Sequence, residues 1–480
     1  MIDKMLRFAD EFDMLPKSGT VLVCVSGGAD SMCLLVALLD ISNKRGFAVS
    51  AAHYNHKLRG GESERDEAFV REQCAIRGVP FFLGAGNVKA YAEVNGLGIE
   101  ESARVMRYDF FIKTAMEMRA ERIATAHTAD DNAETVIINL SRGAGAAGLS
   151  GIPPKRSMIR GADERDGSCL RDCFGLRFAE TAKHDILLIR PMLRVSREEV
   201  MRYISSHCVP FVEDSSNKLD IYTRNKVRHA IIPAIRDINP RFNEAVAATA
   251  TLSRADDEYL SKVADEFIKE RCTGASANAA ELFLLPFAVS GRVVRKLCGS
   301  NLSFNHVTAV LELCGRSDPS ACLSLPGMTV HREYDRVLFG GMEGELREGT
   351  FDPIYPKDGA CMAIPGAGLK MSCKSVVCND IMIRKVNKSV TSFLFKCAGL
   401  CGRMSVRPRR EGDTIKLLGR KGTKTLKRLY IERRVPAWKR ALIPVVADDA
   451  GVLAVYGLGT CGRAVPKPGD VAIQIVFEET

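Results

Sequence analysis

The most constraining feature of this chain is a short polar turn between two apolar segments near its N-terminus. Residues 21–25 form an apolar run typical of a buried strand, and residues 32–39 are apolar and suit a helix. Between them stand Ser26, Gly27, Gly28, Ala29, Asp30 and Ser31. The glycines allow positive φ and a close approach of backbone N–H groups to an anion, and the helix directs the positive end of its dipole to the same place. The sequence therefore predicts a strand–turn–helix unit that cradles phosphate.

The chemistry of this turn differs from that of a Walker A loop, because no Lys-Ser/Thr pair follows the glycines. Asp30 would repel phosphate unless a divalent cation lay between the two, so the turn predicts a Mg²⁺-bound nucleotide with Asp30 at the metal. An ordinary glycine turn is the alternative. Six matching positions between a strand and a helix favour the nucleotide site.

The first 215 residues alternate short apolar strands with amphipathic helices. Strands are expected at 20–25, 47–54, 79–83, 121–126 and 185–190, with helices at 31–44, 63–77, 100–119 and 131–142. This alternation predicts an α/β fold with a doubly wound parallel sheet. Ligands of such sheets bind beyond the carboxyl ends of the strands, where the polar clusters of this sequence fall.

The rest of the chain changes character. We expect a sheet domain over 1–215 with a surface insertion at about 155–184, and a mostly helical middle domain over 216–340 that contains one long helix at 242–272. A connecting segment rich in Gly and Pro is expected over 341–395, followed by a small basic C-terminal domain over 396–480. The 480 residues suffice for several domains.

Charge and cysteine content restrict the partners and the compartment. Residues 403–440 hold fourteen Lys and Arg against three acidic residues, a local net charge of +11, whereas the whole chain carries +10. Charge concentrated in this way is typical of a surface that binds a polyanion. The sixteen cysteines include no Cys-x-x-Cys pair, and many stand in apolar runs, which indicates reduced thiols in the cytoplasm. No apolar run is long enough to span a membrane, and no signal peptide is recognised.

A second polar cluster follows the expected strand at 121–126. His127 leaves the strand, Asp130 is expected to cap the next helix, and Asp131 and Glu134 lie three positions apart on one face of that helix. Two carboxylates beside a nucleotide site suit a metal ion or a cationic substrate. The alternative is a capping Asp followed by solvated acids, but the place of the cluster at the end of a strand favours a functional site.

Three further basic or histidine-containing stretches are candidates for nucleotide or RNA contacts. His53 leaves another expected strand, and Arg107 lies on a helix with Arg104 on the same face. Arg224 and Arg228 are four positions apart and form a basic helical edge beyond the sheet domain. The alternatives are a structural role for His53, ion pairs of Arg104 and Arg107 with Glu100 or Glu101, and a solvated helix face for Arg224 and Arg228.

Taken in order, these motifs resemble those of the tRNA(Ile)-lysidine synthetases, which belong to the PP-loop ATP pyrophosphatases. The matching stretches are SGGADS from residue 26, HYNHKLRG from 53, ESARVMRYDFF from 101, AHTADDNAET from 126, RPML from 190 and YTRNKVRH from 222. The resemblance covers roughly residues 18–240, and the basic segment 407–444 resembles the C-terminal domain of the family. It implies that ATP adenylates O2 of cytidine 34 in the CAU anticodon of tRNA(Ile), after which the side-chain amine of free L-lysine replaces AMP.

The resemblance also implies roles for individual residues, which stay expectations here. Ser26, Gly27, Gly28, Ala29, Asp30, Ser31, His53 and Arg107 would bind ATP, with Asp30 near Mg²⁺. Asp131 and Glu134 would bind the lysine ammonium and, with Asp30 and His127, form the catalytic group. Arg142, Arg224, Arg228, Arg407, Arg409, Lys424, Lys427 and Arg440 are the candidates for tRNA contacts.

Two departures and two alternatives remain. Thr128 stands where the family commonly has a second His, and Asn132 stands where it commonly has Gln. These differences leave the individual contacts of the two residues undecided, but they do not change the expected class of reaction. A PP-loop tRNA thiolase acting on cytidine is disfavoured because those enzymes rely on Cys-x-x-Cys pairs. A non-catalytic RNA-binding protein on the same scaffold is disfavoured because every glycine and acidic position of the loop is intact. The oligomeric state is open, and a homodimer is compatible with the sequence.

Overall fold

The computed structural model describes residues 1–58, 60–158, 185–213, 223–299, 302–316, 321–340, 351–386, 389–420, 422–436 and 438–479. The chain divides into two compact units, Met1–Tyr259 and Leu260–Thr480, and each is described by itself. The expected insertion lies outside the described residues beyond position 158, and so does the expected domain boundary at 215/216. No described helix is both long enough and apolar enough to cross a membrane.

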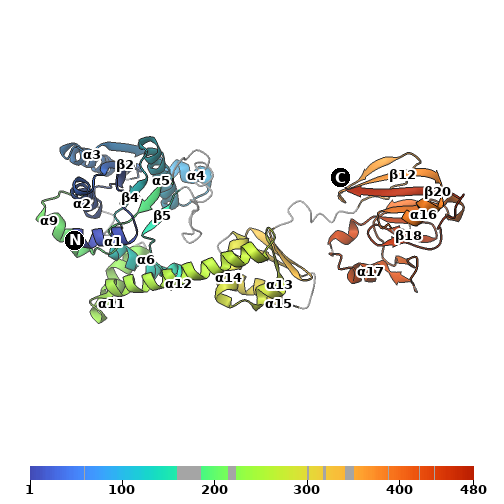
Figure 1. Cartoon of the computed structure of the whole chain (residues 1–480). Helices are drawn as coiled ribbons and strands as arrows, with labels where there is room; N and C mark the ends of the chain where they lie inside the picture. Colours follow the sequence, from blue (N-terminus) through green and yellow to red (C-terminus); the bar gives the residue numbers. More distant parts are fainter. Residues whose placement is uncertain are drawn as a thin grey trace. The chain divides into compact units, whose positions relative to one another are not determined.

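A six-stranded sheet forms the centre of the first unit (Figure 1). Its order is β3 (Phe81–Ala85), β2 (Ala48–Asn55), β1 (Thr20–Cys24), β4 (Arg122–Ala124), β6 (Leu187–Ile189) and β5 (Lys155–Ser157). All neighbours are parallel except β5, which pairs antiparallel with β6. The predicted parallel sheet is confirmed, and its five predicted strands are present. β2 and β3 have the predicted lengths but begin one and two positions later, whereas β1, β4 and β6 are shorter than predicted.

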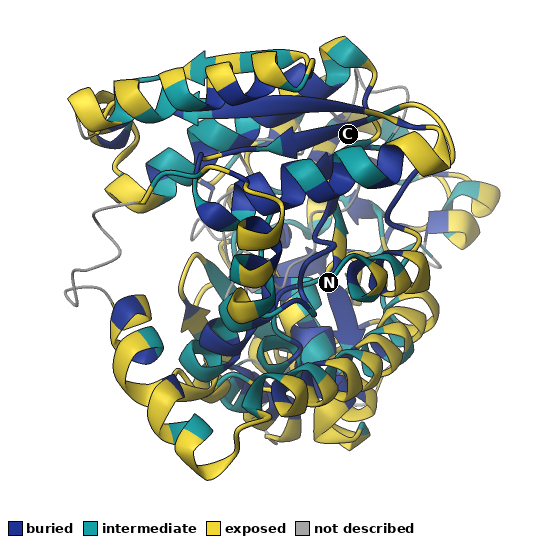
Figure 2. Cartoon of the chain, turned by 90° about the vertical axis from the view of Figure 1, so that its left-hand side faces the viewer, coloured by how far each residue is buried: buried dark blue, intermediate teal, exposed yellow. Residues whose placement is uncertain are grey.

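Helices cover both faces of this sheet, as a doubly wound fold requires. Val21 and Val23 of β1 pack in one core with α1 (Ile2–Glu11), α2 (Ala29–Arg45), α3 (Gly61–Ile76) and α9 (Arg197–Ser206). Leu22, between them, belongs to the opposite core with α5 (Ile99–Met118), because successive side chains of a strand point to opposite faces. The short helix α4 (Val88–Asn95) contacts α5. In Figure 2 the strands are mostly dark blue, whereas the helices carry yellow outer faces.

Further helices of the first unit lie beyond β4 in the sequence. They are α6 (Ala129–Ser141), α7 (Ala146–Leu149), α10 (Thr223–Lys226), a π-helical turn η4 (Val227–Ile231), α11 (Ile232–Ile238) and the first part of the long α12 (Phe242–Arg271), whose residues from Leu260 onward belong to the second unit. A small apolar core joins them, in which Ala133 and Val136 of α6 pack with Val227, Ile232 and Val246. This core fixes η4 against α6, which carries the predicted carboxylates.

The second unit begins with a mixed helical and stranded part. Its helices are α13 (Ala279–Leu284), α14 (Phe287–Cys298) and α15 (Phe304–Gly315). Its sheet runs β7 (Ser276–Asn278), β10 (Arg336–Phe339), β9 (Met328–Glu333) and β8 (Cys322–Leu325). Val293, Val307 and Val330 lie in the shared core. The predicted mostly helical middle part is therefore helical with one small antiparallel sheet.

The last part of the second unit is built from small sheets, and it extends further toward the N-terminus than predicted. One sheet is β11 (Cys361–Ile364), β12 (Leu369–Val377), β20 (Val471–Glu479) and β13 (Ser392–Lys396), and another is β14 (Ser405–Arg407), β17 (Val445–Asp448), β18 (Gly451–Val455) and β19 (Gly459–Thr460). The remaining elements are β15 (Thr414–Ile415), β16 (Lys424–Thr425), α16 (Asp380–Val386), α17 (Leu426–Glu432), and the 3₁₀ turns η5 (Cys397–Gly399) and η6 (Trp438–Ala441). The prediction of a connecting segment over 341–395 is wrong for 351–395, because β11, β12 and β13 share a sheet with β20 at the end of the chain.

Candidate active site

The loop between β1 and α2 has the predicted strand–turn–helix form. Gly27 has φ of +91°, whereas Gly28 has φ of −71° and is the N-cap of α2, so only the first glycine uses the left-handed region. A Cβ atom at Gly27 would also lie 3.3 Å from Val70 Cγ2. The Ser31 hydroxyl accepts from the Ser26 N–H at 3.2 Å and donates to the Gly28 carbonyl at 2.9 Å. No side chain of the described residues caps α2, which leaves the first N–H groups of the helix available to an anion.

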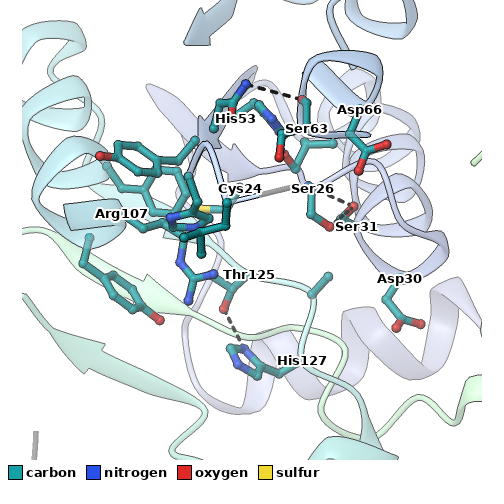
Figure 3. Close-up of a pocket in the computed structure, with 18 residues that line it drawn as sticks. Cys24, Ser26, Asp30, Ser31, His53, Ser63, Asp66, Arg107, Thr125 and His127 are labelled. Carbon is teal, nitrogen blue, oxygen red and sulfur yellow. Dashed lines mark hydrogen bonds between the residues drawn. The ribbon is translucent and has the colours of Figure 1, made fainter. Parts of the chain in front are cut away.

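A cavity of about 480 Å³ opens beside this loop (Figure 3). The predicted residues that line it are Ser26, Asp30, Ser31, His53, Arg107 and His127, and they come from β1, α2, β2, α5 and the end of β4. Asn55 and His56, from the predicted stretch that begins at His53, also line the cavity. The remaining polar and aromatic residues of its lining were not predicted as contacts and include Cys24, Tyr54, Asp66, Tyr108 and Thr125. Residues from four separate motifs thus meet at the carboxyl ends of neighbouring parallel strands.

The two histidines of the cavity have different surroundings. His53 is buried, and its Nδ1 lies 2.8 Å from the Val25 carbonyl, so the ring ties β2 to the end of β1. His127 Nδ1 lies 3.0 Å from Thr125 Oγ1. Burial, with Arg190 nearby, lowers the pKa of His127 to about 3, so this imidazole is neutral at physiological pH. His127 is therefore suited to hydrogen bonding rather than to carrying positive charge.

Asp30 has one satisfied and one unsatisfied carboxylate oxygen. Its Oδ2 accepts from Arg197 Nη1 at 3.1 Å, whereas Oδ1 is buried and has no hydrogen-bond partner among the described residues. Burial raises the pKa of Asp30 to about 6; Arg197 opposes this effect and Asp131 adds to it. An unpaired carboxylate oxygen beside free helix N–H groups fits a hard cation that accompanies phosphate. Since the described residues hold no group of three or more His, Cys, Asp or Glu that could bind a metal, such a cation would take its other ligands from phosphate and water.

The start of α6 differs from the prediction in its cap. Thr128, not Asp130, is the N-cap, and Asp131 closes a capping box because its Oδ2 accepts from the Thr128 N–H at 2.8 Å. Burial acts to raise the pKa of Asp131, but the hydrogen bonds from Thr128 and the positive charge of Arg224 outweigh it, so the pKa lies below its usual value. Asp131 is therefore ionised at neutral pH. Its Oδ1 lies 3.6 Å from Arg228 Nη2, beyond hydrogen-bond distance.

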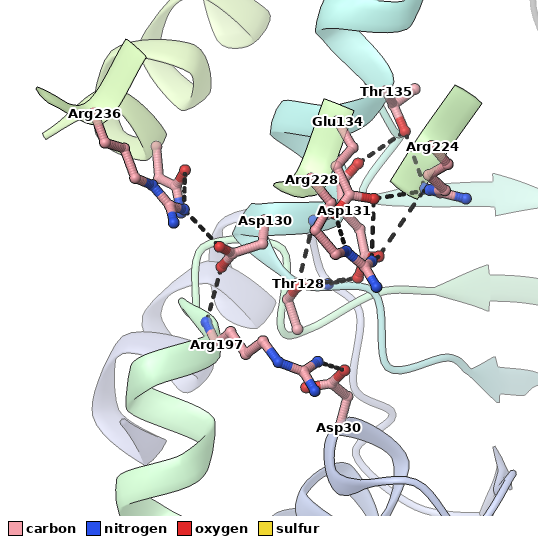
Figure 4. A network of polar contacts seen from close by, with 11 residues as sticks. Asp30, Thr128, Asp130, Asp131, Glu134, Thr135, Arg197, Arg224, Arg228 and Arg236 are labelled. Carbon is pink, nitrogen blue, oxygen red and sulfur yellow. Dashed lines mark hydrogen bonds and ion pairs between the residues drawn. The ribbon is translucent and has the colours of Figure 1, made fainter. Parts of the chain in front are cut away.

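Glu134 is one turn further along α6 and already has two partners (Figure 4). Arg224 Nε donates to its Oε2 at 2.9 Å, and Arg228 Nε donates to its Oε1 at 2.5 Å. The Glu134 side chain is only 1% exposed. Two expectations change. Glu134 is not an open carboxylate, and Arg224 and Arg228, which were predicted to form a basic edge beyond the sheet domain, pair with Glu134 at the active site.

Asp130 links three helices, and no sequence motif indicated this. Its Oδ2 accepts from the Arg197 N–H at 2.8 Å and its Oδ1 accepts from Arg236 Nη2 at 2.6 Å, which joins α6 to α9 and α11. Arg197 also reaches Asp30, so it contacts both acidic motifs (Figure 4). The one available signal was the capping box that begins at Ser196, which places Arg197 at the start of a helix.

The predicted tRNA-binding residues are in several environments. Arg407 is buried, and its guanidinium donates to both Asp413 oxygens at 2.8 and 2.9 Å, so its prediction as an RNA contact is wrong on physical grounds. Lys424 Nζ pairs with Glu432 at 2.7 Å, and Arg440 Nε donates to the Val435 carbonyl at 2.9 Å. Of the remaining candidates, Arg142 and Lys427 are exposed and Arg409 is half-buried.

Comparisons with known proteins identify the family of this chain. A family model described as PP-loop domain matches residues 2–235, one described as TilS substrate binding domain matches 278–338, and one described as TilS substrate C-terminal domain matches 404–476. The tRNA(Ile)-lysidine synthase of Geobacillus kaustophilus is 32% identical, and the match covers 95% of each chain. The chain belongs to the tRNA(Ile)-lysidine synthase family, whose members are also called tRNA(Ile)-lysidine synthetases.

Other relatives of the tRNA(Ile)-lysidine synthase family match over the same length. The synthase of Clostridioides difficile is 29% identical over 95% of this chain and 94% of its own. A solved structure titled as the TILS C-terminal domain is 24% identical, with a TM-score of 0.25, and covers 27% of this chain and 97% of that chain. The chain thus matches its curated relatives from sheet domain to C-terminal domain.

Proposed function

We propose that this protein joins free L-lysine to C2 of cytidine 34 in the CAU anticodon of tRNA(Ile), in two steps driven by ATP. In the first step, O2 of the cytidine attacks the α-phosphorus of ATP and pyrophosphate leaves. In the second step, the lysine Nζ amine attacks C2, the C2–O2 bond breaks, and AMP leaves with that oxygen. Membership of the tRNA(Ile)-lysidine synthase family supports this proposal. We also propose that the enzyme works in the cytoplasm; a homodimer is not part of the proposal.

The single observation that carries the proposal is the meeting of the SGGADS loop with Arg107 and His127 in one cavity. The Gly27–Ser31 turn and the uncapped start of α2 provide N–H groups for the phosphates. Arg107 would neutralise phosphate charge, and neutral His127 would hydrogen-bond the nucleotide or the cytosine. Mg²⁺, when bound at Asp30, would withdraw charge from the phosphates as pyrophosphate leaves.

The second half of the reaction needs a group for the lysine amine. We propose Asp131 as the residue that binds the ammonium and accepts its proton, because its Oδ1 has no hydrogen bond within 3.5 Å among the described residues. Glu134 would act through Arg224 and Arg228, holding both guanidiniums beside Asp131. Arg224 and Arg228 are then available for a carboxylate or a phosphate of the substrates, a role that replaces the predicted outer RNA contact.

The experiment is product analysis with purified protein, ATP, lysine and tRNA(Ile) that carries the CAU anticodon. The proposal predicts AMP and pyrophosphate in equal amounts, with sustained ATP consumption only when both lysine and this tRNA are present. A tRNA in which C34 is replaced by U is the matched control, and it should support no turnover. Formation of ADP, or turnover without lysine, would contradict the proposed reaction.

A further inference from the structure

The contact between Arg197 and Asp30 joins α9 to the nucleotide loop across 167 positions of sequence. It is a poor stabilising interaction, since the Arg197 side chain is 50% exposed and the Asp30 side chain 27%. Ion pairs as open as this contribute about 0–1 kcal/mol to stability. The stability that this ion pair adds to the fold is therefore too small to explain why Arg197 is positioned at the Asp30 carboxylate.

The backbone of Arg197 is held firmly although its side chain is open. Ser196 and Glu199 form a capping box at the start of α9, and the Arg197 N–H donates to Asp130 at 2.8 Å. Asp130 is held in turn by Arg236. The origin of the Arg197 side chain is thus fixed relative to α6 and α11, and its guanidinium extends from there to the start of α2 (Figure 4).

The two oxygens of Asp30 complete the observation. Arg197 occupies Oδ2, and the buried Oδ1 has no partner among the described residues. Carboxylates that bind metal ions are commonly held by hydrogen bonds to their second oxygen, and loss of such a partner typically costs 10–100-fold in metal affinity. We propose that Arg197 is a positioning residue that fixes Asp30 so that Oδ1 faces the cation accompanying ATP. This role rests on the proposed nucleotide site and adds a residue that lies in none of the predicted motifs.

Arg197 also reduces the negative charge that Asp30 presents to the nucleotide. One of its guanidinium nitrogens donates to Asp30, and the residue also lines a groove of about 1160 Å³ together with residues of α11 and α12. A cation bound at Oδ1 and a guanidinium at Oδ2 both lower the repulsion between Asp30 and a triphosphate. Binding of the nucleotide and binding of the cation should therefore depend on each other through Arg197.

The test measures how strongly Mg²⁺ promotes nucleotide binding. The probe is an ATP analogue with a methylene group between the α and β phosphates, and its Kd is measured with saturating Mg²⁺ and with EDTA. We expect Asp30→Asn to bring the ratio of the two Kd values close to one. Arg197→Gln should reduce the wild-type ratio about tenfold. The double variant should match Asp30→Asn alone, because Arg197 acts through Asp30.

Two further variants separate positioning from a general effect on folding or charge. Arg197→Lys keeps the charge but has fewer donors, so its ratio should lie between wild type and Arg197→Gln. Arg202→Gln removes an exposed arginine from the same helix and the same groove, and it should keep the wild-type ratio. The proposal is overturned if Arg197→Gln keeps the wild-type ratio, or if its effect adds to that of Asp30→Asn. A wild-type protein without any effect of Mg²⁺ would overturn the proposed cation site and this role together.

Discussion

At the scale of single residues, Asp131 and Glu134 are three positions apart but are expected to respond differently to substitution. Asp131→Asn keeps an oxygen that can accept from the Thr128 N–H, so the capping box of α6 can persist. It removes the charge that would bind the lysine ammonium and accept its proton. We expect ATP-analogue affinity to change less than threefold and lysine transfer to fall about hundredfold or more. Rapid-quench analysis of adenylated tRNA and lysidine measures the two steps separately.

The matched control for Asp131→Asn is Asp237→Asn, which removes an exposed carboxylate from α11. This control should leave both steps unchanged. If Asp131→Asn lost ATP binding and lysine transfer to the same degree, the division of labour between the nucleotide loop and α6 would be refuted.

The raised pKa of Asp30 predicts a pH dependence of stability with a definite sign. Because burial raises this pKa from 3.8 to about 6, the ionised side chain destabilises the folded state, and the penalty grows as pH rises through this window. Asp30→Asn removes the penalty. Without nucleotide and with EDTA present, the variant should be more stable than wild type above pH 6, by up to roughly 3 kcal/mol. The difference should shrink as pH falls toward 4 in urea unfolding experiments. A difference that is constant with pH would show that Asp30 has an ordinary pKa.

The nucleotide loop could be predicted from sequence because every part of it is local. Strand, glycine turn and helix follow one another from β1 to α2, and of the two glycines that allow positive φ only Gly27 adopts it. The arginine partners of the site could not be predicted in the same way. Arg197 and Arg228 meet Asp30 and Glu134 only after the chain has folded, and a basic residue on a helix carries no sign of its distant partner.

At the scale of secondary-structure elements, the pair Arg407–Asp413 connects β14 to the loop before β15. The two side chains are 8% and 11% exposed, so loss of one partner would leave a nearly buried charge unpaired. Arg407→Ala should destabilise the C-terminal part by about 3 kcal/mol.

Lys427→Ala changes a residue on the exposed side of α17 and should leave the free energy of unfolding unchanged. It should reduce the slope of log affinity for tRNA against log salt concentration by about one.

Denaturant unfolding and salt-dependent tRNA binding of these two variants give the comparison. Equal stability of Arg407→Ala and wild type would contradict the structural role of Arg407. Arg407 was predicted to contact tRNA because it belongs to a strongly basic segment. The sequence gives the net charge of such a segment, but it does not show which of the arginines form ion pairs within the protein.

The pairing of β12 with β20 is a second limit on prediction at this scale. Nine residue pairs join the strands, from Leu369–Glu479 to Val377–Val471. Their partners are about a hundred positions apart in sequence, and the glycines and prolines that precede β12 favoured a connecting segment over 341–395 rather than a domain. Alternating apolar and polar residues at the start of β12 were the local signal for a strand, but this alternation does not identify the partner strand.

At the scale of the whole molecule, this pairing decides where the chain can be shortened. A chain ending at 395 would lack β20 and would uncover Met371 and Phe393, which are nearly inaccessible in the intact sheet. We expect this shortened chain to aggregate.

A chain ending at Gly340 lacks the whole C-terminal part and should stay monodisperse in size-exclusion chromatography. It should bind the ATP analogue as wild type does, with weaker tRNA binding and a shallower salt dependence.

The opposite result would refute the assignment of tRNA affinity to the basic segment 403–440. If the chain ending at 340 kept the wild-type salt slope, the phosphate contacts would lie elsewhere. If the chain ending at 395 were as soluble as the full chain, the sheet formed by β11, β12, β20 and β13 would not be the structural unit that its pairing indicates.

The central claim concerns the whole molecule, since it requires the nucleotide loop and the start of α6 to act on one nucleotide, cytidine 34, of a bound tRNA. The most direct test is mass spectrometry of nucleoside 34 after tRNA(Ile) with the CAU anticodon is incubated with the protein, ATP and isotopically labelled lysine. We predict that C34 alone gains the labelled lysine, with one AMP formed per modified tRNA. An unmodified C34, label at another nucleotide, or modification without AMP would contradict the proposed function.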